Sequence, residues 1–109
     1  MNDQTDILLV YCSCPDAETA GRIATALVEQ QLAACVSQVP GLISTYRWEG
    51  QMQQDAETLL MIKTRKTTYA ELEKTLLRMH PYELPEVIAV PVIAGSKPYL
   101  AWINNNTSA

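Results

Sequence analysis

The spacing of apolar residues changes several times along the chain, and each change predicts the boundary of an element. Residues 7–12 form a continuous apolar run, which is typical of a buried strand. In residues 15–31 the apolar positions recur at helical spacing on one face. Residues 32–48 and 51–65 again have the pattern of strands, and Glu49-Gly50 between them is typical of a hairpin turn. The first part of the chain is therefore predicted to be β-α-β-β.

Both arms of this hairpin are far longer than the usual strand of about five or six residues, so the hairpin should protrude. Pro40-Gly41 marks a bend or bulge in its first arm. Tyr46 and Trp48 lie on one face, where they could line a ligand cleft, although an interface core is the favoured interpretation. Because protruding strand edges pair with other chains, we expect an obligate oligomer built on this hairpin. A charge placed at Ile43 or Trp48 should disrupt its assembly before it disrupts the subunit.

The second half of the chain continues the same kind of pattern. The capping-box motif Thr68–Glu71 predicts a second helix, which Pro81 ends. Residues 87–92 have the pattern of a fourth strand, restricted to an edge or a bulge by its proline. Ser96 should cap a short C-terminal helix, and the polar tail 104–109 is predicted to be frayed. The order β-α-β-β-α-β plus a helix predicts an α+β fold of the ferredoxin-like, split βαβ type.

The composition indicates a single globular domain over residues 1–109, with 48% apolar and 18% charged residues. The net charge is −4 and no basic stripe is present, so nucleic acids and anionic membranes are poor partners. Residues 7–12 are too few to span a bilayer. Asp3 and Asp6 precede them where a secretory signal would carry positive charge. We therefore expect a cytoplasmic protein, in which the three cysteines are free thiols or soft metal ligands.

Cys12-Ser13-Cys14 is the first candidate for chemistry. Side chains alternate along a strand, so Cys12 and Cys14 should point to the same side and Ser13 away from it. Two thiolates on one side could bind a soft cation such as Cu(I) or Zn(II). The alternative, favoured by the residues alone, is that Cys12 is a small buried apolar residue and Cys14 simply precedes a proline.

The segment from Met79 to Glu86 is the second candidate. His80, the single histidine, lies beside Met79 in a stretch that also contains Tyr82 and Glu83 and is held by two prolines. Imidazole and thioether are ligands that copper accepts, and Glu83 or Glu86 could orient the imidazole. The alternative is a helix-ending loop with a merely hydrogen-bonded histidine. The residues do not decide whether Cys12 and His80 meet within one subunit.

Two further patterns give weaker evidence for a function. A Cys–His pair could be a nucleophile and its base, but no orienting residue or oxyanion donor accompanies it, so an enzyme is not expected. The basic run 63–66 could attract a phosphate or carboxylate. A solvated strand end is the favoured interpretation, because no glycine-rich loop accompanies this run.

Several motifs, in order over nearly the whole chain, resemble those of the CutA family of divalent-cation-tolerance proteins. Among them, the W-E-G turn and the H-P-Y-x-x-P-E loop are together specific. The matching stretches are Cys12-Ser13-Cys14-Pro15-Asp16, Leu32-Ala33-Ala34-Cys35, Tyr46-Arg47-Trp48-Glu49-Gly50, Glu57 through Lys63-Thr64, His80-Pro81-Tyr82-Glu83-Leu84-Pro85-Glu86 and Tyr99-Leu100-Ala101-Trp102-Ile103.

This resemblance implies a cytoplasmic homotrimer of ferredoxin-like subunits whose hairpins pair with one another, linked to tolerance of copper and other divalent metals. Copper binding in bacterial members uses a cysteine at the end of the first strand and two adjacent histidines before Pro-Tyr. These positions correspond to Cys12, Met79 and His80. Because Met79 replaces an imidazole by a thioether, the expected preference shifts toward Cu(I). Cys14 is an additional thiol that could compensate.

Three functions therefore remain open. The expected one is a metal-binding trimer that contributes to cation tolerance. The second is a trimeric module that binds a small anion in a cleft between subunits, metal tolerance being indirect. The third is a scaffold that presents partner proteins. Such a scaffold would have an exposed apolar patch, which the sequence does not show. The residues of the anion cleft would be Lys63, Arg65, Tyr82 and Glu86.

Overall fold

The computed structural model describes residues 6–108 and confirms the predicted fold, a four-stranded antiparallel sheet with helices. The strand order β2-β3-β1-β4 places β1 and β3 in the centre. The elements in chain order are β1 (Ile7–Cys14), α1 (Ala17–Glu29), β2 (Cys35–Trp48), β3 (Gln51–Arg65), the 3-10 turn η2 (Lys66–Thr68), α2 (Tyr69–Met79), β4 (Ile88–Pro91) and α3 (Lys97–Asn105).

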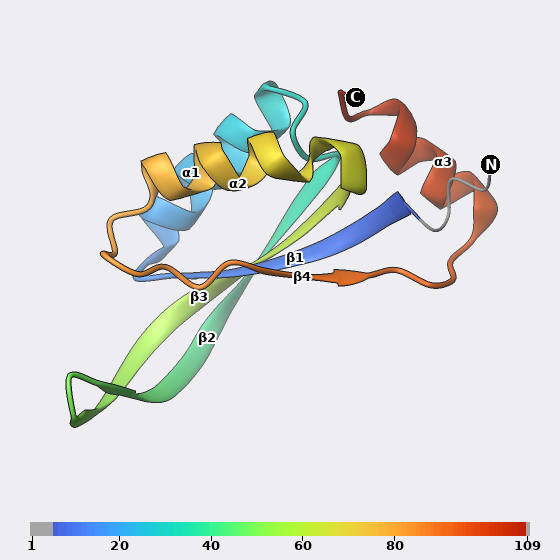
Figure 1. Ribbon diagram of the computed structural model, residues 1–109. Helices are drawn as coiled ribbons and strands as arrows, with labels where there is room; N and C mark the ends of the chain where they lie inside the picture. The colour runs from blue at the N-terminus through green and yellow to red at the C-terminus, as the bar shows by residue number, and fades with distance from the viewer. Residues whose placement is uncertain (1–5, 109) are drawn as a thin grey trace.

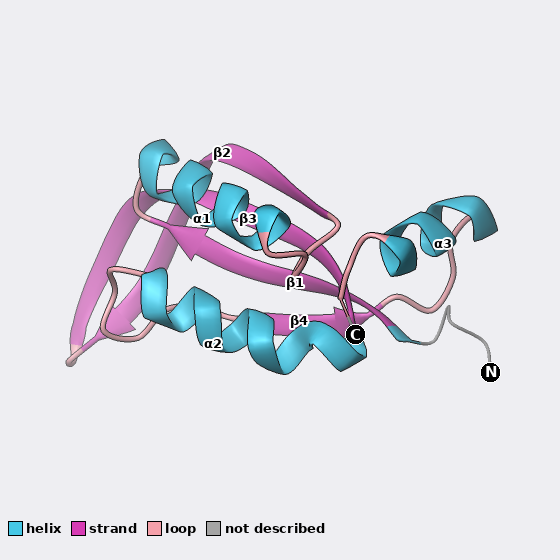
Figure 2. Ribbon diagram, turned by 90° about the horizontal axis from the view of Figure 1, so that it is seen from above, coloured by secondary structure: helices cyan, strands magenta, loops and turns pink. Residues whose placement is uncertain are grey.

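Helices α1 and α2 lie side by side on one face of the sheet (Figures 1 and 2). Asp16 begins α1 by accepting a hydrogen bond from the Thr19 N–H at 2.8 Å. The apolar stripe of α1 then packs on the inward-facing positions of the central strands. The fully buried members of this core include Val10, Ile23, Leu27, Leu60, Ile62, Leu72 and Leu76.

The β2–β3 hairpin is as long as the sequence predicts and extends well beyond the helices (Figure 1). It makes the subunit elongated, with dimensions of 47 × 25 × 22 Å. The strand register shifts between Val39 and Leu42, which confirms the bulge at Pro40-Gly41. Glu49 and Gly50 both have positive φ, 51° and 78°, as a two-residue turn that matches the strand twist requires.

The sheet face opposite α1 and α2 is largely uncovered in the single chain. Strand pairing puts Tyr11, Met61 and Ile88 in one row across this face, and Leu9, Lys63 and Val90 in the next. Ile88 is 53% exposed and Val90 39%. The structure thus has an exposed apolar face, which we did not expect from the sequence.

Helix α3 forms a second, smaller core with Ile7 and Ala34 at the other end of the sheet. Ser96 caps it as predicted, accepting from the Tyr99 N–H at 3.3 Å. The prediction of a frayed tail is wrong for residues 104–108. Arg65 donates to Asn104 Oδ1 at 3.0 Å and to the carbonyl oxygen of Thr107 at 2.5 Å, and the Ser108 N–H donates to Gln31 O at 2.8 Å. Residue 109 lies outside the described residues.

Two local predictions need correction for the same reason. Thr68 precedes α2, but its side chain makes no capping hydrogen bond. Its hydroxyl donates instead to the carbonyl oxygen of Ser108. The run 63–66 is not a solvated strand end either, because Thr64 is fully buried and donates to Leu32 O at 2.7 Å. In both cases a side-chain hydroxyl that the sequence assigned to a local role makes a hydrogen bond to a residue distant in sequence.

Candidate metal centre

Strand β1 positions the two cysteines. Cys12 and Cys14 point to the face covered by the helices, and both are fully buried. Ser13 points to the opposite face, where its hydroxyl donates to Glu86 Oε1 at 3.4 Å. The predicted alternation of these three side chains is confirmed, and it follows from the two-residue period of a strand.

His80 reaches the same place from the end of α2. Its backbone is extended, with φ −76° and ψ 136°, because Pro81 disfavours a helical conformation of the residue before it. The ring turns toward the end of β1, and its Nε2 lies 2.8 Å from Ser13 O. Its Nδ1 accepts a hydrogen bond from the Tyr82 N–H at 3.1 Å. His80 is 7% exposed.

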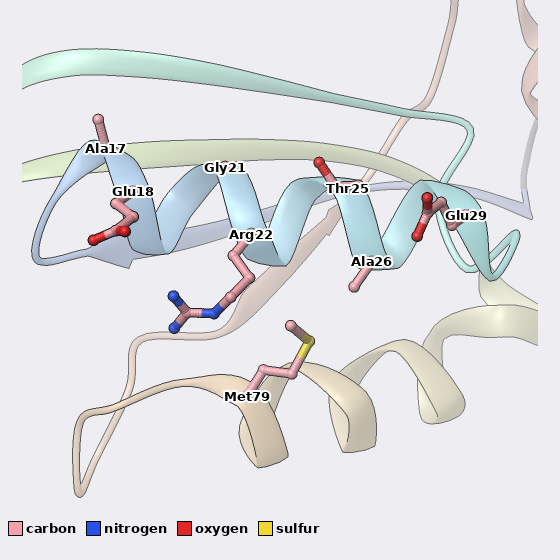
Figure 3. A pocket seen from close by; sticks show the side chains of 8 residues that line it. All are labelled: Ala17, Glu18, Gly21, Arg22, Thr25, Ala26, Glu29 and Met79. Atoms are coloured by element: carbon pink, nitrogen blue, oxygen red, sulfur yellow. The ribbon is translucent and has the colours of Figure 1, made fainter.

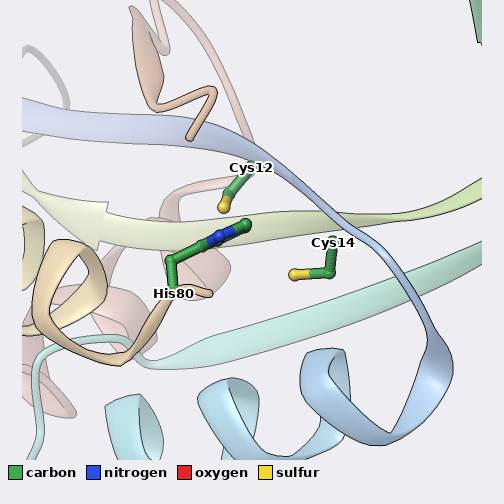
Figure 4. A group of neighbouring side chains, drawn as sticks. All are labelled: Cys12, Cys14 and His80. Atoms are coloured by element: carbon green, nitrogen blue, oxygen red, sulfur yellow. The ribbon is translucent and has the colours of Figure 1, made fainter. Parts of the chain in front are cut away.

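Cys12, Cys14 and His80 form one cluster within a single chain (Figure 4), which answers the question that the sequence left open. Their ligand atoms lie within 4.8 Å of one another. Figure 4 shows both thiol groups on the side of the strand that faces the imidazole. Three side chains that bind soft metals are thereby brought together in a buried place.

The two thiols shift each other's pKa in opposite directions. The hydrogen bond between Cys12 and Cys14 raises the pKa of Cys12, and burial and the charges of Cys14, Glu86 and Glu57 raise it further. The same hydrogen bond lowers the pKa of Cys14. The pair therefore gives up one proton from Cys14 more readily than a second from Cys12.

The loop after His80 is fixed to the end of the sheet. The Tyr82 hydroxyl donates to Glu57 Oε2 at 2.7 Å, and the rings of Tyr82 and His80 lie 4.7 Å apart. Burial, together with this hydrogen bond, raises the pKa of Tyr82. Of the acidic residues predicted to support the site, Glu86 contacts Ser13, whereas Glu83 is exposed. The predicted orientation of the imidazole by Glu83 or Glu86 is not what the structure has, because backbone groups contact both ring nitrogens.

Met79, which was predicted to be a further ligand, lies between α2 and α1 (Figure 3). Its side chain points from α2 toward α1 and lines a surface groove of about 580 Å³ (Figure 3). The α1 residues of this groove include Gly21, Arg22 and Ala26. The cause is helical geometry, since consecutive residues at the end of a helix point in different directions.

Lys63 lies on the opposite face of the sheet from the cysteines. Its Nζ donates to Ser37 Oγ at 2.8 Å and lies 3.9 Å from Cys35 Sγ.

The three predicted interface residues are all accessible on the hairpin. Ile43 is 62% exposed, Tyr46 41% and Trp48 36%. Tyr46 also donates a hydrogen bond to Asp55.

Glu57 is a site residue that the sequence pattern did not predict. It is only 8% exposed, although glutamate is rarely buried without a partner. Its strand, β3, changes there from a polar to an apolar pattern, and this change was the available signal for a half-buried carboxylate. Its partner Tyr82 is 25 positions away in sequence, so only the fold identifies the pair.

Comparison with known proteins agrees with this fold. The family model described as CutA1 divalent ion tolerance protein matches residues 8–106. The chain is 44% identical over 99 residues to the divalent-cation tolerance protein CutA of Thermus thermophilus, covering 91% of this chain and 96% of that protein. The crystal structure of CutA from Xylella fastidiosa matches with a TM-score of 0.92 and 44% identity, covering 94% of this chain and 99% of that one. The chain therefore belongs to the CutA1 divalent ion tolerance family.

A plant relative differs in length and location. The chain is 44% identical over 100 residues to the chloroplastic protein CutA of Arabidopsis thaliana, covering 92% of this chain but only 55% of that protein. Within residues 6–108, none of the helices combines the length and the apolar character that crossing a membrane requires.

Proposed function

We propose that this protein is a cytoplasmic, homotrimeric metal-binding protein that contributes to tolerance of copper and other divalent cations, and that it is not an enzyme. The observation that carries the proposal is the cluster of Cys12, Cys14 and His80. The name of the Thermus relative, a divalent-cation tolerance protein, supports the same biological role.

The chemistry of the cluster suits a soft ion. Thiolates select Cu(I) in particular, and imidazole is also accepted by copper. A metal–thiolate bond is about 2.3 Å long, so atoms within 4.8 Å of one another can reach one ion after small side-chain rotations. Since Met79 lines the groove between α1 and α2, the preference for Cu(I) is argued from the second cysteine rather than from a thioether.

An anaerobic titration of the reduced protein with Cu(I), against a competing chelator, tests this function. We expect one ion per subunit to be held against the chelator. Cys12→Ala should lower the affinity without dissociating the trimer, because Cys12 lies under the helices rather than on an accessible face. Weak or non-stoichiometric uptake would contradict the proposal and make metal tolerance an indirect effect.

The proposed trimer is supported by the apolar surface that one chain leaves open. Val39 and Ile88 on the uncovered sheet face are 37% and 53% exposed, and Met52 on the hairpin is 64% exposed. Monomeric proteins rarely expose large contiguous apolar patches. Association of three copies through these surfaces would remove them from water and cover the hairpin edges.

Lys63 favours a second candidate, a trimeric module that binds a small anion between subunits. Its hydrogen-bond partners within residues 6–108, Ser37 and Cys35, are neutral. A half-buried ammonium group with neutral partners attracts phosphate or carboxylate. A thermal-shift screen of nucleotides and carboxylic acids tests this candidate, with Lys63→Gln as control. A ligand that stabilises the unaltered protein but not this variant would support it, and no shift across the screen would count against it.

A further inference from the structure

We propose that Cys12 and Cys14 alone ligate the metal ion, and that His80 fixes the covering loop without binding the ion. This inference rests on the proposed function, because it divides the roles among the residues of that same site. It makes Cys14 a ligand of equal importance to Cys12 and treats the histidine as a positioning residue.

The hydrogen bonds of His80 leave its ring without a free lone pair. A neutral imidazole has one N–H group and one lone pair. Ser13 O can only accept a hydrogen bond, so Nε2, at 2.8 Å, carries the proton. The Tyr82 N–H can only donate, so Nδ1, at 3.1 Å, supplies the lone pair. A metal ion could bind this ring only after one of these hydrogen bonds has broken, which would leave a polar group without its partner.

The same two hydrogen bonds explain why the histidine is present. They join the end of α2 and the Pro81-Tyr82 segment to the last residues of β1. Tyr82 then reaches Glu57 on β3. The imidazole therefore closes the loop over the two thiols and keeps them away from water.

The two cysteines are already arranged as a pair. They occupy alternate positions of one strand and point to the same side, and their sulfur atoms lie within 4.8 Å of each other. Both belong to the buried core, so their positions are held by packing. An ion that replaces the thiol protons needs no movement of the backbone, since both ligands come from the same strand.

Two sulfur ligands define the class of ion. Zn(II) in proteins is almost always four-coordinate, so this pair would satisfy half of its requirement. Cu(I) is soft and accepts two thiolates without further ligands. The carboxylates of Glu57 and Glu86 place negative potential at Cys12, which attracts a cation to the pair. The site is therefore assigned to Cu(I) in two-sulfur coordination.

Competition titrations of the full chain with Cu(I) and bathocuproine disulfonate, under reducing and anaerobic conditions, test the assignment. Cys12→Ser and Cys14→Ser should each weaken binding more than about 100-fold, beyond the usual loss for a supporting residue. His80→Gln retains a side-chain N–H for Ser13 O and should weaken binding by about tenfold, the low end of the usual loss for a supporting residue. Cys35→Ser, which removes a thiol outside the cluster, is the matched control and should bind normally.

X-ray absorption of the unaltered protein loaded with Cu(I) gives a second measurement, should a variant fail to fold. We expect two sulfur scatterers and no imidazole scattering. Imidazole scattering, or a loss in His80→Gln equal to that in Cys12→Ser while Cys14→Ser binds normally, would overturn the inference and leave the proposed function intact. Absence of stoichiometric binding in the unaltered protein would refute both.

Discussion

Gln31 ends α1 with a left-handed backbone conformation, φ 59°, which residues with a Cβ adopt at a cost. The conformation directs the chain so that Gln31 O accepts from both the backbone N–H and the hydroxyl of Ser108. Glycine adopts the same conformation freely. Gln31→Gly should therefore raise the free energy of unfolding by about 0.5 kcal/mol. This net gain is the relief of the backbone cost, reduced by the extra conformational entropy that glycine loses on folding.

Gln30, with φ −87°, is the matched control. Gln30→Gly introduces the same change at an ordinary backbone conformation and should lower the free energy of unfolding by about 0.5–1 kcal/mol. Urea denaturation at a fixed protein concentration measures both. Destabilisation of the two variants by equal amounts would show that the backbone of Gln31 carries no cost.

Thr64 is a buried hydroxyl with one long-range role. It donates to Leu32 O at 2.7 Å and so ties the segment after α1 to β3. Thr64→Val keeps the shape but leaves that carbonyl without this donor, and should lower the free energy of unfolding by about 1–2 kcal/mol. Thr67→Val, at an exposed position, is the control and should change it by less than about 0.5 kcal/mol. A similar effect of both variants would contradict the role of the buried hydrogen bond.

At the scale of elements, Arg65 at the end of β3 holds the C-terminal tail through Asn104 and Thr107. Arg65→Met keeps much of the aliphatic side chain but removes both hydrogen bonds. Amide hydrogen exchange in residues 104–108 should become at least about tenfold faster, equivalent to about 1.4 kcal/mol of local stability. Lys66→Met, at the exposed neighbouring position, should leave exchange in the tail unchanged. Unchanged exchange in both variants would mean that other contacts hold the tail.

The elements themselves were predictable because their signals are local. Apolar spacing located the central strands and both major helices, and the Glu49-Gly50 turn located the hairpin. The wrong predictions concern polar side chains that can form a hydrogen bond with either a nearby or a distant residue. Thr68 was expected to cap α2, but it donates to Ser108, 40 positions away. A pattern within one helix carries no information about such a partner.

At the scale of the whole molecule, the exposed hairpin predicts how the protein associates. Trp48→Glu would place an unpaired charge in the proposed apolar interface, which is unfavourable. We expect the trimer to dissociate at least about tenfold more readily, or about 1.4 kcal/mol, while the circular dichroism of the subunit is unchanged. Light scattering over a range of protein concentrations measures the association.

Leu77→Glu is the control for this prediction. Leu77 is 46% exposed, similar to Trp48, but it lies on α2 and not on the hairpin. This variant should remain trimeric. A trimer that persists in Trp48→Glu, or is lost equally in Leu77→Glu, would contradict an interface built on the hairpin.

The candidate site was only partly predictable. That Cys12 and Cys14 share a face follows from strand alternation, a property of adjacent residues. That His80 meets them, that Met79 lines the groove beside α1 and that Glu57 pairs with Tyr82 depend on the packing of α2 and its following loop. The protonated nitrogen of His80 is decided by the carbonyl and N–H groups around it, which no motif specifies.

Interactions between residues close along the chain specify the order of the elements, the long hairpin and the shared face of the two cysteines. These features could therefore be predicted before the fold was known. Only the packed structure shows which face of the sheet stays open, which polar groups find distant partners and which nitrogen of His80 carries the proton. These outcomes depend on contacts between segments far apart in sequence, where the cost of burying an unsatisfied polar group selects the partner.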